Sequence, residues 1–120
     1  MQHVGVDIIE IGRIEESLKK FGQAFLDRIY SPKEIEAYSE KLPSLAARFA
    51  AKEAVIKALD APGLNPREVE ILSAPDGKPL LTLSGKAKKK ADALGIPCLN
   101  ISLSHSREYA VAFVVGESAD

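Results

Sequence analysis

Apolar and polar residues alternate along this chain with two periods, one dominant before residue 60 and one after it. In the first part, apolar residues mostly recur every three or four positions, which is the spacing of one face of a helix. In the second part, short runs rich in branched apolar residues indicate strands. The pattern predicts helices over residues 12–22, 24–29, 32–40, 45–59 and 85–94. It predicts strands over residues 2–11, 69–72, 80–83, 96–104 and 108–116.

Residues that start and stop regular structure mark the boundaries of these elements. The tetrapeptide Ser31–Glu34 is typical of a helix start, with a serine N-cap, a proline at the first position and a glutamate three residues after the cap. Ser44 and Ser84 are expected to cap the helices that follow them. The loop with the most concentrated helix and strand breakers spans residues 60–66 and divides the helical part of the chain from the strand-rich part.

The predicted helix over residues 45–59 combines an apolar surface with several charges. At about 100° per residue its apolar side chains fall on nearly every side, so the helix is expected to be buried. It nevertheless carries Arg48, Lys52, Glu53 and Lys57. Buried charges are costly unless they are paired or bound to a metal. The charges on this buried helix therefore predict a functional site on it.

The order of the elements predicts an α+β fold in a single domain over residues 1–120. Short connections at residues 74–79 and 104–109 favour antiparallel hairpins. The strand over residues 108–116 has small and apolar residues on both faces, so we expect it at the centre of its sheet. The predicted architecture is one antiparallel-rich sheet wrapped by a long buried central helix and shorter helices.

Composition narrows the classes of protein to which this chain can belong. With 46% hydrophobic and 28% charged residues it has the balance of an ordinary globular protein. A net charge of −1 argues against a nucleic-acid partner. Cys98 is the only cysteine, which excludes a disulfide framework and fits a reducing, cytoplasmic location. No signal segment is apparent, and no apolar run reaches the roughly 18 residues that span a membrane.

Two acidic residues stand where acidic residues are unexpected. Asp7 interrupts the apolar strand over residues 2–11, and Glu53 lies on the buried helix. Two such carboxylates could share one hard cation and leave positions for water and substrate oxygens, which is how Mg²⁺ commonly binds a phosphate-bearing substrate. Lys57, with Arg48 or Lys52, could then balance phosphate charge.

Each of these residues also has a simpler interpretation. Asp7 could be a carboxylate at a strand edge that faces water, and Glu53 could form an ion pair with Lys57 one helical turn away. His105, within Ser-His-Ser, could cap a turn. The lysines of the helix over residues 85–94 are typical of a solvated face. No phosphate-binding glycine-rich fingerprint, zinc motif or nucleophile elbow is present.

Several separated motifs together resemble those of a known family. They are Val-Gly-Val-Asp-Ile-Ile-Glu-Ile-Gly-Arg-Ile at residues 4–14, Arg-Phe-Ala-Ala-Lys-Glu-Ala at 48–54, Val-Glu-Ile at 69–71, Gly-Lys-Pro at 77–79, Leu-Ser-Gly-Lys-Ala at 83–87 and Ser-Leu-Ser-His-Ser at 102–106. Their order and the length of the chain closely resemble the holo-acyl-carrier-protein synthases, the short bacterial class of 4′-phosphopantetheinyl transferases.

The resemblance implies an activity and a set of catalytic residues. The enzyme would move the phosphopantetheine arm of coenzyme A onto a serine of apo acyl carrier protein, for fatty acid synthesis, and release adenosine 3′,5′-bisphosphate. Asp7 and Glu53 would hold Mg²⁺ against the pyrophosphate, and Lys57 would meet phosphate oxygens. A carboxylate, acting directly or through a water, would take the serine proton, and the sequence leaves this choice open.

The resemblance also implies binding residues outside the catalytic set. Lys78, Pro79 and His105 match positions near the nucleotide end of coenzyme A, and Arg48 and Lys52 are also expected to contact coenzyme A. Arg13 and Arg28 match a surface that meets the acidic helix of the carrier protein, although Arg28 could instead pair with a nearby acid, Asp27 or Glu34.

Two departures from the family pattern are local. Ala24 replaces a common basic residue, which would weaken carrier docking. The loop over residues 62–66 lacks the usual glycine-rich sequence, which affects the expected shape of the coenzyme A cleft.

The family is typically a homotrimer with active sites between subunits. The strand over residues 108–116, apolar on both faces, agrees with extra burial by a partner subunit. Two other functions remain open from the sequence. One is a non-catalytic module that binds coenzyme A or a carrier protein, and the other is a metal-dependent phosphohydrolase that uses the same two carboxylates.

Overall fold

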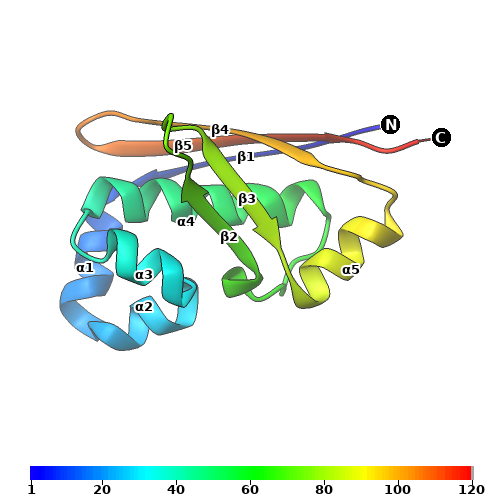
Figure 1. Cartoon of the computed structure of the whole chain (residues 1–120). Coiled ribbons are helices and arrows are strands. Elements are labelled where there is room, and N and C mark those ends of the chain that lie inside the picture. The colour runs from blue at the N-terminus through cyan, green and yellow to red at the C-terminus, as the bar shows by residue number, and fades with distance from the viewer. Residues whose placement is uncertain (120) are drawn as a thin grey trace.

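A three-stranded antiparallel sheet, with one long helix packed along one of its faces, forms the centre of the fold (Figure 1). This computed structural model describes residues 1–119. The strands lie in the order β1 (Gln2–Glu10), β5 (Tyr109–Glu117) and β4 (Leu99–His105). The long helix is α4 (Leu42–Ala58). Although α4 is largely apolar, no helix among the described residues is long and apolar enough to cross a membrane.

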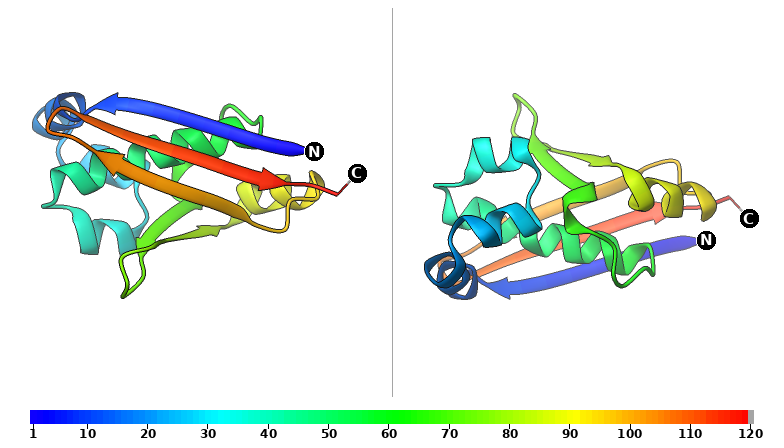
Figure 2. Two further views of the ribbon diagram at one scale, coloured as in Figure 1. Left: turned by 90° about the horizontal axis from the view of Figure 1, so that it is seen from above. Right: turned by 90° about the horizontal axis from the view of Figure 1, so that it is seen from below.

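The remaining helices lie on the side of the sheet that α4 covers (Figure 1). The helices are α1 (Ile11–Phe21), α2 (Gln23–Ile29), α3 (Pro32–Tyr38) and α5 (Gly85–Ala93), with a short 3₁₀ helix η1 (Pro66–Glu68). Strands β2 (Val69–Ser73) and β3 (Pro79–Leu83) form a separate two-stranded hairpin. Figure 2 shows this hairpin beside the β4 edge of the sheet, with β1 at the other edge.

The predicted α+β class, the antiparallel hairpins and the central place of the last strand are confirmed. The strands differ from the prediction in dividing between two sheets. The sheet also explains the apolar pattern of β5, because one face packs on α4 and the other is directed outward. On the inner face Ala112 and Val114 are fully buried, whereas Phe113 between them is half exposed.

The two largest differences between predicted and observed element boundaries have local reasons. Helix α4 begins at Leu42 instead of Leu45, because Pro43 falls in the first turn, where its missing N–H is not needed. Strand β4 begins at Leu99 instead of Ile96. The N–H of Ile96 closes the end of α5 by donating to the carbonyl of Ala91 at 3.0 Å.

The predicted caps are confirmed in one case, confirmed in position only in a second and wrong in the third. Ser31 and Glu34 form a reciprocal capping box at the start of α3. Ser84 occupies the N-cap position of α5, but its side chain makes no capping hydrogen bond. Ser44 lies inside α4 and is not its cap.

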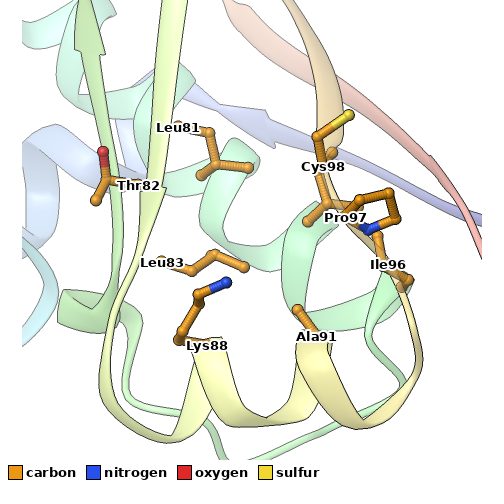
Figure 3. A pocket seen from close by; sticks show the side chains of 9 residues that line it. Leu81, Thr82, Leu83, Lys88, Ala91, Ile96, Pro97 and Cys98 are labelled. Atoms are coloured by element: carbon orange, nitrogen blue, oxygen red, sulfur yellow. The ribbon is translucent and has the colours of Figure 1, made fainter.

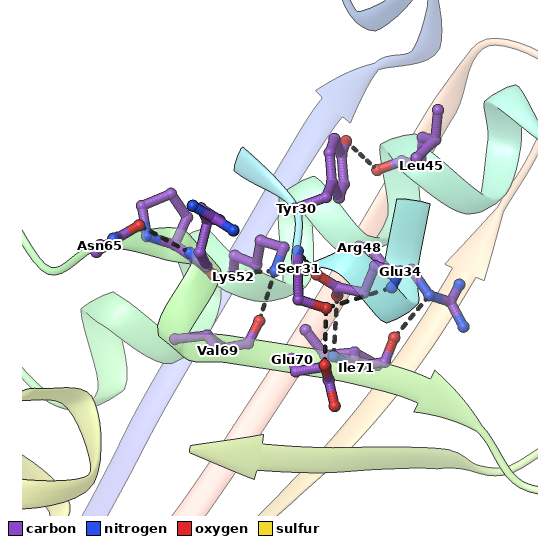
Figure 4. Close-up of polar contacts among 12 residues, drawn as sticks. Tyr30, Ser31, Glu34, Leu45, Arg48, Lys52, Asn65, Val69, Glu70 and Ile71 are labelled. Atoms are coloured by element: carbon purple, nitrogen blue, oxygen red, sulfur yellow. Dashed lines mark hydrogen bonds and ion pairs between the residues drawn. The ribbon is translucent and has the colours of Figure 1, made fainter. Parts of the chain in front are cut away.

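A buried ion pair fixes α4 against the neighbouring α3 and β2 (Figure 4). The Lys52 ammonium lies 2.7 Å from Oε1 of Glu34, and both side chains are almost fully enclosed. The other carboxylate oxygen of Glu34 accepts the N–H of Ile71 at 3.0 Å. Burial lowers the pKa of Lys52, and the charge of Glu34 opposes that shift. Because each charge has a hydrogen-bonded partner, the pair can exist in the interior.

Arg48 extends the same network toward the hairpin. Its Nε donates to the carbonyl of Ile71 at 2.9 Å, and an Nη donates to the Ser73 hydroxyl at 2.9 Å. The guanidinium stacks on Tyr38, with its central carbon 3.6 Å from the ring centroid. Two of the four charges of α4 therefore hold β2 in place.

We expect that Lys52→Met lowers the free energy of unfolding by about 3–5 kcal/mol, because it leaves the Glu34 carboxylate buried without its counter-ion. Urea unfolding followed by circular dichroism measures the change. The matched control is Lys88→Met, which removes the exposed ion pair with Asp92 and should cost less than about 1 kcal/mol. Equal effects of the two substitutions would contradict the structural role of Lys52.

Candidate functional site

Three charged side chains meet where β1 passes over α4. The Nζ of Lys57 lies 3.0 Å from Oδ1 of Asp7 and donates to the carbonyl oxygen of Val6 at 3.1 Å. Glu53, one turn earlier on α4, is near enough to both charges for each to affect its ionisation. The Asp7 side chain is 20% exposed and that of Lys57 is 55% exposed, so solvent reaches the cluster from one side.

The pKa of Glu53 reflects its surroundings. It is raised from its ordinary value, first by partial burial and then by the negative charge of Asp7, while Lys57 opposes the shift. Burial and the nearby negative charge of Asp7 both disfavour the ionised form of Glu53. A cation bound between the two carboxylates would relieve that repulsion.

The local structure explains why these residues come together. Gly5, Asp7 and Ile9 occupy alternate positions of β1 and face α4, as the two-residue period of a strand requires. Glu53 and Lys57 are four residues apart and so lie on the same side of the helix. The structure brings Asp7 to Lys57 of α4, whereas the joint role of Asp7 and Glu53 as metal ligands stays a prediction.

The structure does not agree with the simpler interpretations of Asp7 and Glu53. Lys57 forms its ion pair with Asp7 and not with Glu53. Asp7 is mostly enclosed and is not a free carboxylate at a strand edge.

The donor set fits a hard divalent cation. Asp7 and Glu53 offer carboxylate oxygens, which Mg²⁺ prefers. Among residues 1–119, no group of three or more His, Cys, Asp or Glu side chains is placed to hold a metal. An ion held by this pair would therefore need water or substrate oxygens to complete its coordination. This is the usual arrangement for Mg²⁺ with a phosphate-bearing ligand.

The predicted coenzyme A contacts at Lys78 and Pro79 lie at the opposite edge of the sheet. They line a groove of about 520 Å³ between β3 and β4. The other lining residues are Leu80, Leu81, Leu99, Asn100 and Ile101. Because β5 lies between β4 and β1, one chain does not bring this groove together with Asp7 (Figure 2). His105 is exposed at the end of β4, and its Nδ1 lies 3.4 Å from the Ser106 carbonyl oxygen of its own turn.

Lys52 was predicted as a coenzyme A contact, and its surroundings argue against that role. An ammonium has three N–H donors. In the structure these reach Oε1 of Glu34 and the carbonyl oxygens of Pro66 and Val69. With the side chain 1% exposed, no donor remains for a phosphate. Arg48 is also buried but keeps unused donors near Ser73, so its contact with coenzyme A stays a prediction.

Sequence reasoning missed the role of Glu34. Its place in the capping box was predicted, but its pairing with Lys52 was not. One signal was available, because Lys52 required a buried partner and a capping glutamate has one face turned into the protein. The sequence offered no means of choosing Glu34 among the other acids.

The predicted carrier-binding residues Arg13 and Arg28 are exposed on α1 and α2. Neither forms an ion pair among the described residues. The alternative partners of Arg28 have other contacts, since Asp27 accepts from Gln23 at 2.8 Å and Glu34 binds Lys52. The two guanidinium groups are therefore available to an acidic partner.

A further cavity of about 270 Å³ lies between β3, α5 and the start of β4 (Figure 3). Its lining includes apolar Leu83, Ala91 and Ile96 as well as Lys88, which pairs with Asp92. It contains no carboxylate pair. The predicted metal ligands Asp7 and Glu53 are not among its lining residues.

Comparison with known proteins gives the family. A model of the 4′-phosphopantetheinyl transferase superfamily matches residues 3–114. The chain belongs to this superfamily. The holo-[acyl-carrier-protein] synthase of Dehalococcoides mccartyi is 52% identical over 98% of this chain and 99% of its own. That of Herpetosiphon aurantiacus is 44% identical over 93% of this chain and 95% of its own.

Solved structures of the superfamily share the fold. The holo-[acyl-carrier-protein] synthase of Helicobacter pylori in complex with coenzyme A is 41% identical, with a TM-score of 0.86 over 95% of this chain and 99% of its own. That of Neisseria meningitidis is 35% identical, with a TM-score of 0.87 over 97% of this chain and 98% of its own. The family predicted from the sequence motifs is confirmed.

We expect that Glu53→Gln raises the melting temperature of the metal-free protein at neutral pH. The fold raises the pKa of Glu53 and so disfavours the ionised carboxyl, which the substitution removes. Because the folded pKa lies above the unfolded one, wild type gains stability as pH falls, and the advantage of the variant should vanish below the ordinary value of 4.5. Thermal unfolding from about pH 4 to about pH 8 measures this dependence.

The control for this pH series is Asp92→Asn on α5, which should show no such advantage. Added Mg²⁺ should raise the melting temperature of wild type but not of Glu53→Gln, because a ligand stabilises only the state that binds it. Equal stabilisation of both proteins by Mg²⁺ would exclude Glu53 from the metal site.

Proposed function

We propose that this chain transfers the 4′-phosphopantetheine group of coenzyme A to a serine of apo acyl carrier protein. Adenosine 3′,5′-bisphosphate is released, and the holo carrier protein serves fatty acid synthesis. The observation that carries the proposal is the meeting of Asp7, Glu53 and Lys57 at the contact of β1 with α4. It occurs in a chain with 41% identity to a synthase solved with coenzyme A.

The two carboxylates would hold Mg²⁺ against the pyrophosphate of coenzyme A. The bound ion would neutralise phosphate charge and make the attacked phosphorus more electrophilic. Asp7 is fixed by its strand and Glu53 by its helix, so their oxygens are positioned before substrate arrives. One of the two carboxylates would accept the proton of the carrier serine as it attacks.

Lys57 would contribute a positive charge to the same reaction. Its ammonium is 55% exposed and ends beside Asp7, where a phosphate oxygen could approach it. Phosphoryl transfer depends mainly on positioning and charge neutralisation, and a nearby ammonium serves both.

Two features support a homotrimer with active sites between subunits. The groove at Lys78 and Pro79 and the carboxylate pair lie at opposite edges of one sheet, so a neighbouring subunit could supply the missing half. The outer face of the sheet is also apolar and uncovered, with Val6 51% exposed. Val6 and Phe113 are register partners on that face, and exposed apolar patches of this kind mark interfaces.

Carrier docking would use the exposed Arg13 and Arg28. These positive charges are local, which reconciles an acidic partner with a net charge of −1. Ala24, exposed on α2, would add nothing to this attraction. The cytoplasm is the proposed location, and the free thiol of Cys98 agrees with a reducing compartment.

Incubation with Mg²⁺, coenzyme A and an apo carrier protein should increase the carrier mass by one phosphopantetheine group. Glu53→Gln and Asp7→Asn should each lower the rate about a hundredfold or more, because losing a metal ligand removes several kcal/mol of transition-state stabilisation. The matched control is Asp92→Asn, an exposed acid on α5 that should retain the wild-type rate. Mass spectrometry of the carrier measures the reaction.

Two other results of this assay would replace the proposal. Binding of coenzyme A without a gain in carrier mass would indicate a non-catalytic module. Cleavage of coenzyme A without a gain in mass would indicate a phosphohydrolase.

We expect Val6→Glu to convert a trimer into a monomer, because it places a charge in the apolar face between subunits. Light scattering after size exclusion gives the mass. Phe21→Glu is the matched control, since Phe21 is 53% exposed but lies at the end of α1, away from the sheet. A wild-type protein that is monomeric at working concentration would overturn the trimer.

A further inference from the structure

Gly5 lies at the closest approach of β1 to α4. A Cβ placed on it would be 1.8 Å from the carbonyl oxygen of Ala54, 2.8 Å from its carbonyl carbon and 3.0 Å from the amide nitrogen of Ala58. All three are backbone atoms, so no rotation of a side chain could relieve the contact. Glycine is required here because of close backbone approach, and not because of a positive φ.

The helix side of this contact is made of small residues. Ala50, Ala51, Ala54 and Ala58 are all buried in the same hydrophobic core cluster as Ala112 and Val114 of β5. A methyl group is the smallest side chain that still fills space, so the helix and the strand can approach closely. Gly5 removes even that group at the point of contact.

The contact point lies among the three charges of the proposed site. Asp7 follows Gly5 by two residues on the same face of β1. Glu53 immediately precedes Ala54, and Lys57 immediately precedes Ala58. A change in separation at Gly5 is therefore transmitted to the gap between Asp7 and Glu53 with almost no intervening chain.

We infer that Gly5 is a positioning residue for the metal site, an inference that rests on the proposed function. Its missing side chain sets the separation of the two carboxylates. To restore ordinary contact of 3.4 Å from 1.8 Å, an alanine would have to move β1 about 1.6 Å from α4. Mg²⁺ needs near-octahedral oxygens at about 2.0–2.1 Å, whereas Ca²⁺ accepts about 2.3–2.6 Å in flexible geometry. The shift should therefore harm Mg²⁺ binding more than Ca²⁺ binding.

Substitutions at two other glycines serve as controls, because they distinguish an effect on the geometry of the metal site from an effect on stability. A Cβ on Gly116 would come within 2.5 Å of Leu99 and 2.9 Å of Ile96, both through side-chain atoms. Gly116 pairs with His3 near the far end of β1, so Gly116→Ala disturbs packing away from the carboxylates. A Cβ on Gly12 would meet nothing within 4 Å, so Gly12→Ala is a neutral control.

The test measures Mg²⁺ and Ca²⁺ dissociation constants by calorimetry for wild type, Gly5→Ala, Gly116→Ala, Gly12→Ala and Glu53→Gln. Urea unfolding of each gives its stability. Gly5→Ala should weaken Mg²⁺ binding about tenfold or more, comparable to the loss of a residue that orients a ligand, and Ca²⁺ binding less. Gly116→Ala should lose stability but keep its Mg²⁺ affinity, and Gly12→Ala should keep its Mg²⁺ affinity without any loss of stability.

Each outcome is decisive for Gly5 or for the metal site itself. If Glu53→Gln loses Mg²⁺ while Gly5→Ala binds it within about twofold of wild type, Gly5 has no positioning role. If Glu53→Gln binds Mg²⁺ as wild type does, the proposed metal site fails and Gly5 has nothing to position. If Gly5→Ala does not fold, Ala54→Ser, which adds one atom to the buried turn that contacts Gly5, should weaken Mg²⁺ binding in the same direction. Unchanged Mg²⁺ binding in a folded Ala54→Ser would overturn the inference.

Discussion

The fold depends on how closely α4 approaches the sheet. Backbone contact between Gly5 and the turn at Ala54 is possible because both sides have almost no side chain. A larger residue on either side would separate the layers, and interiors are packed too densely to absorb the change locally. On its other side α4 is fixed by the buried Lys52–Glu34 pair. The helix is thus held by a steric fit toward β1 and by paired charges toward α3 and β2.

This arrangement divides the charges of α4 into two functional groups. Arg48 and Lys52 point toward the hairpin and use their donors on protein acceptors. Glu53 and Lys57 lie toward β1, where solvent and Asp7 meet. The charges of α4 are therefore compatible with its largely apolar surface. Arg48 and Lys52 are enclosed with partners, and Glu53 and Lys57 are at least partly exposed.

The sequence could predict what depends on local pattern and on motifs. The capping box at Ser31, the central strand β5 and the pairing of Asp7 with α4 each had a signal in residue type and spacing. Contacts between residues far apart in the sequence had no such signal, because hydrophobic period and secondary-structure propensity do not indicate which distant acid pairs with a given lysine. For this reason Lys52 was assigned to coenzyme A and not to Glu34. The close contact at Gly5 could not be predicted either, since it depends on the distance between β1 and α4 in the folded protein.

The contrast between Lys52 and Lys57 shows how similar lysines on one helix can serve opposite purposes. Lys52 is enclosed with all three N–H donors used, so exchanging its partner would leave the Glu34 carboxylate uncompensated. Lys57 is more than half exposed, and an ion pair of that kind contributes little to stability. Its bond to Asp7 can therefore be exchanged for a phosphate oxygen at low cost. Under the proposed function, a cation that takes the Asp7 carboxylate would release the lysine toward the substrate.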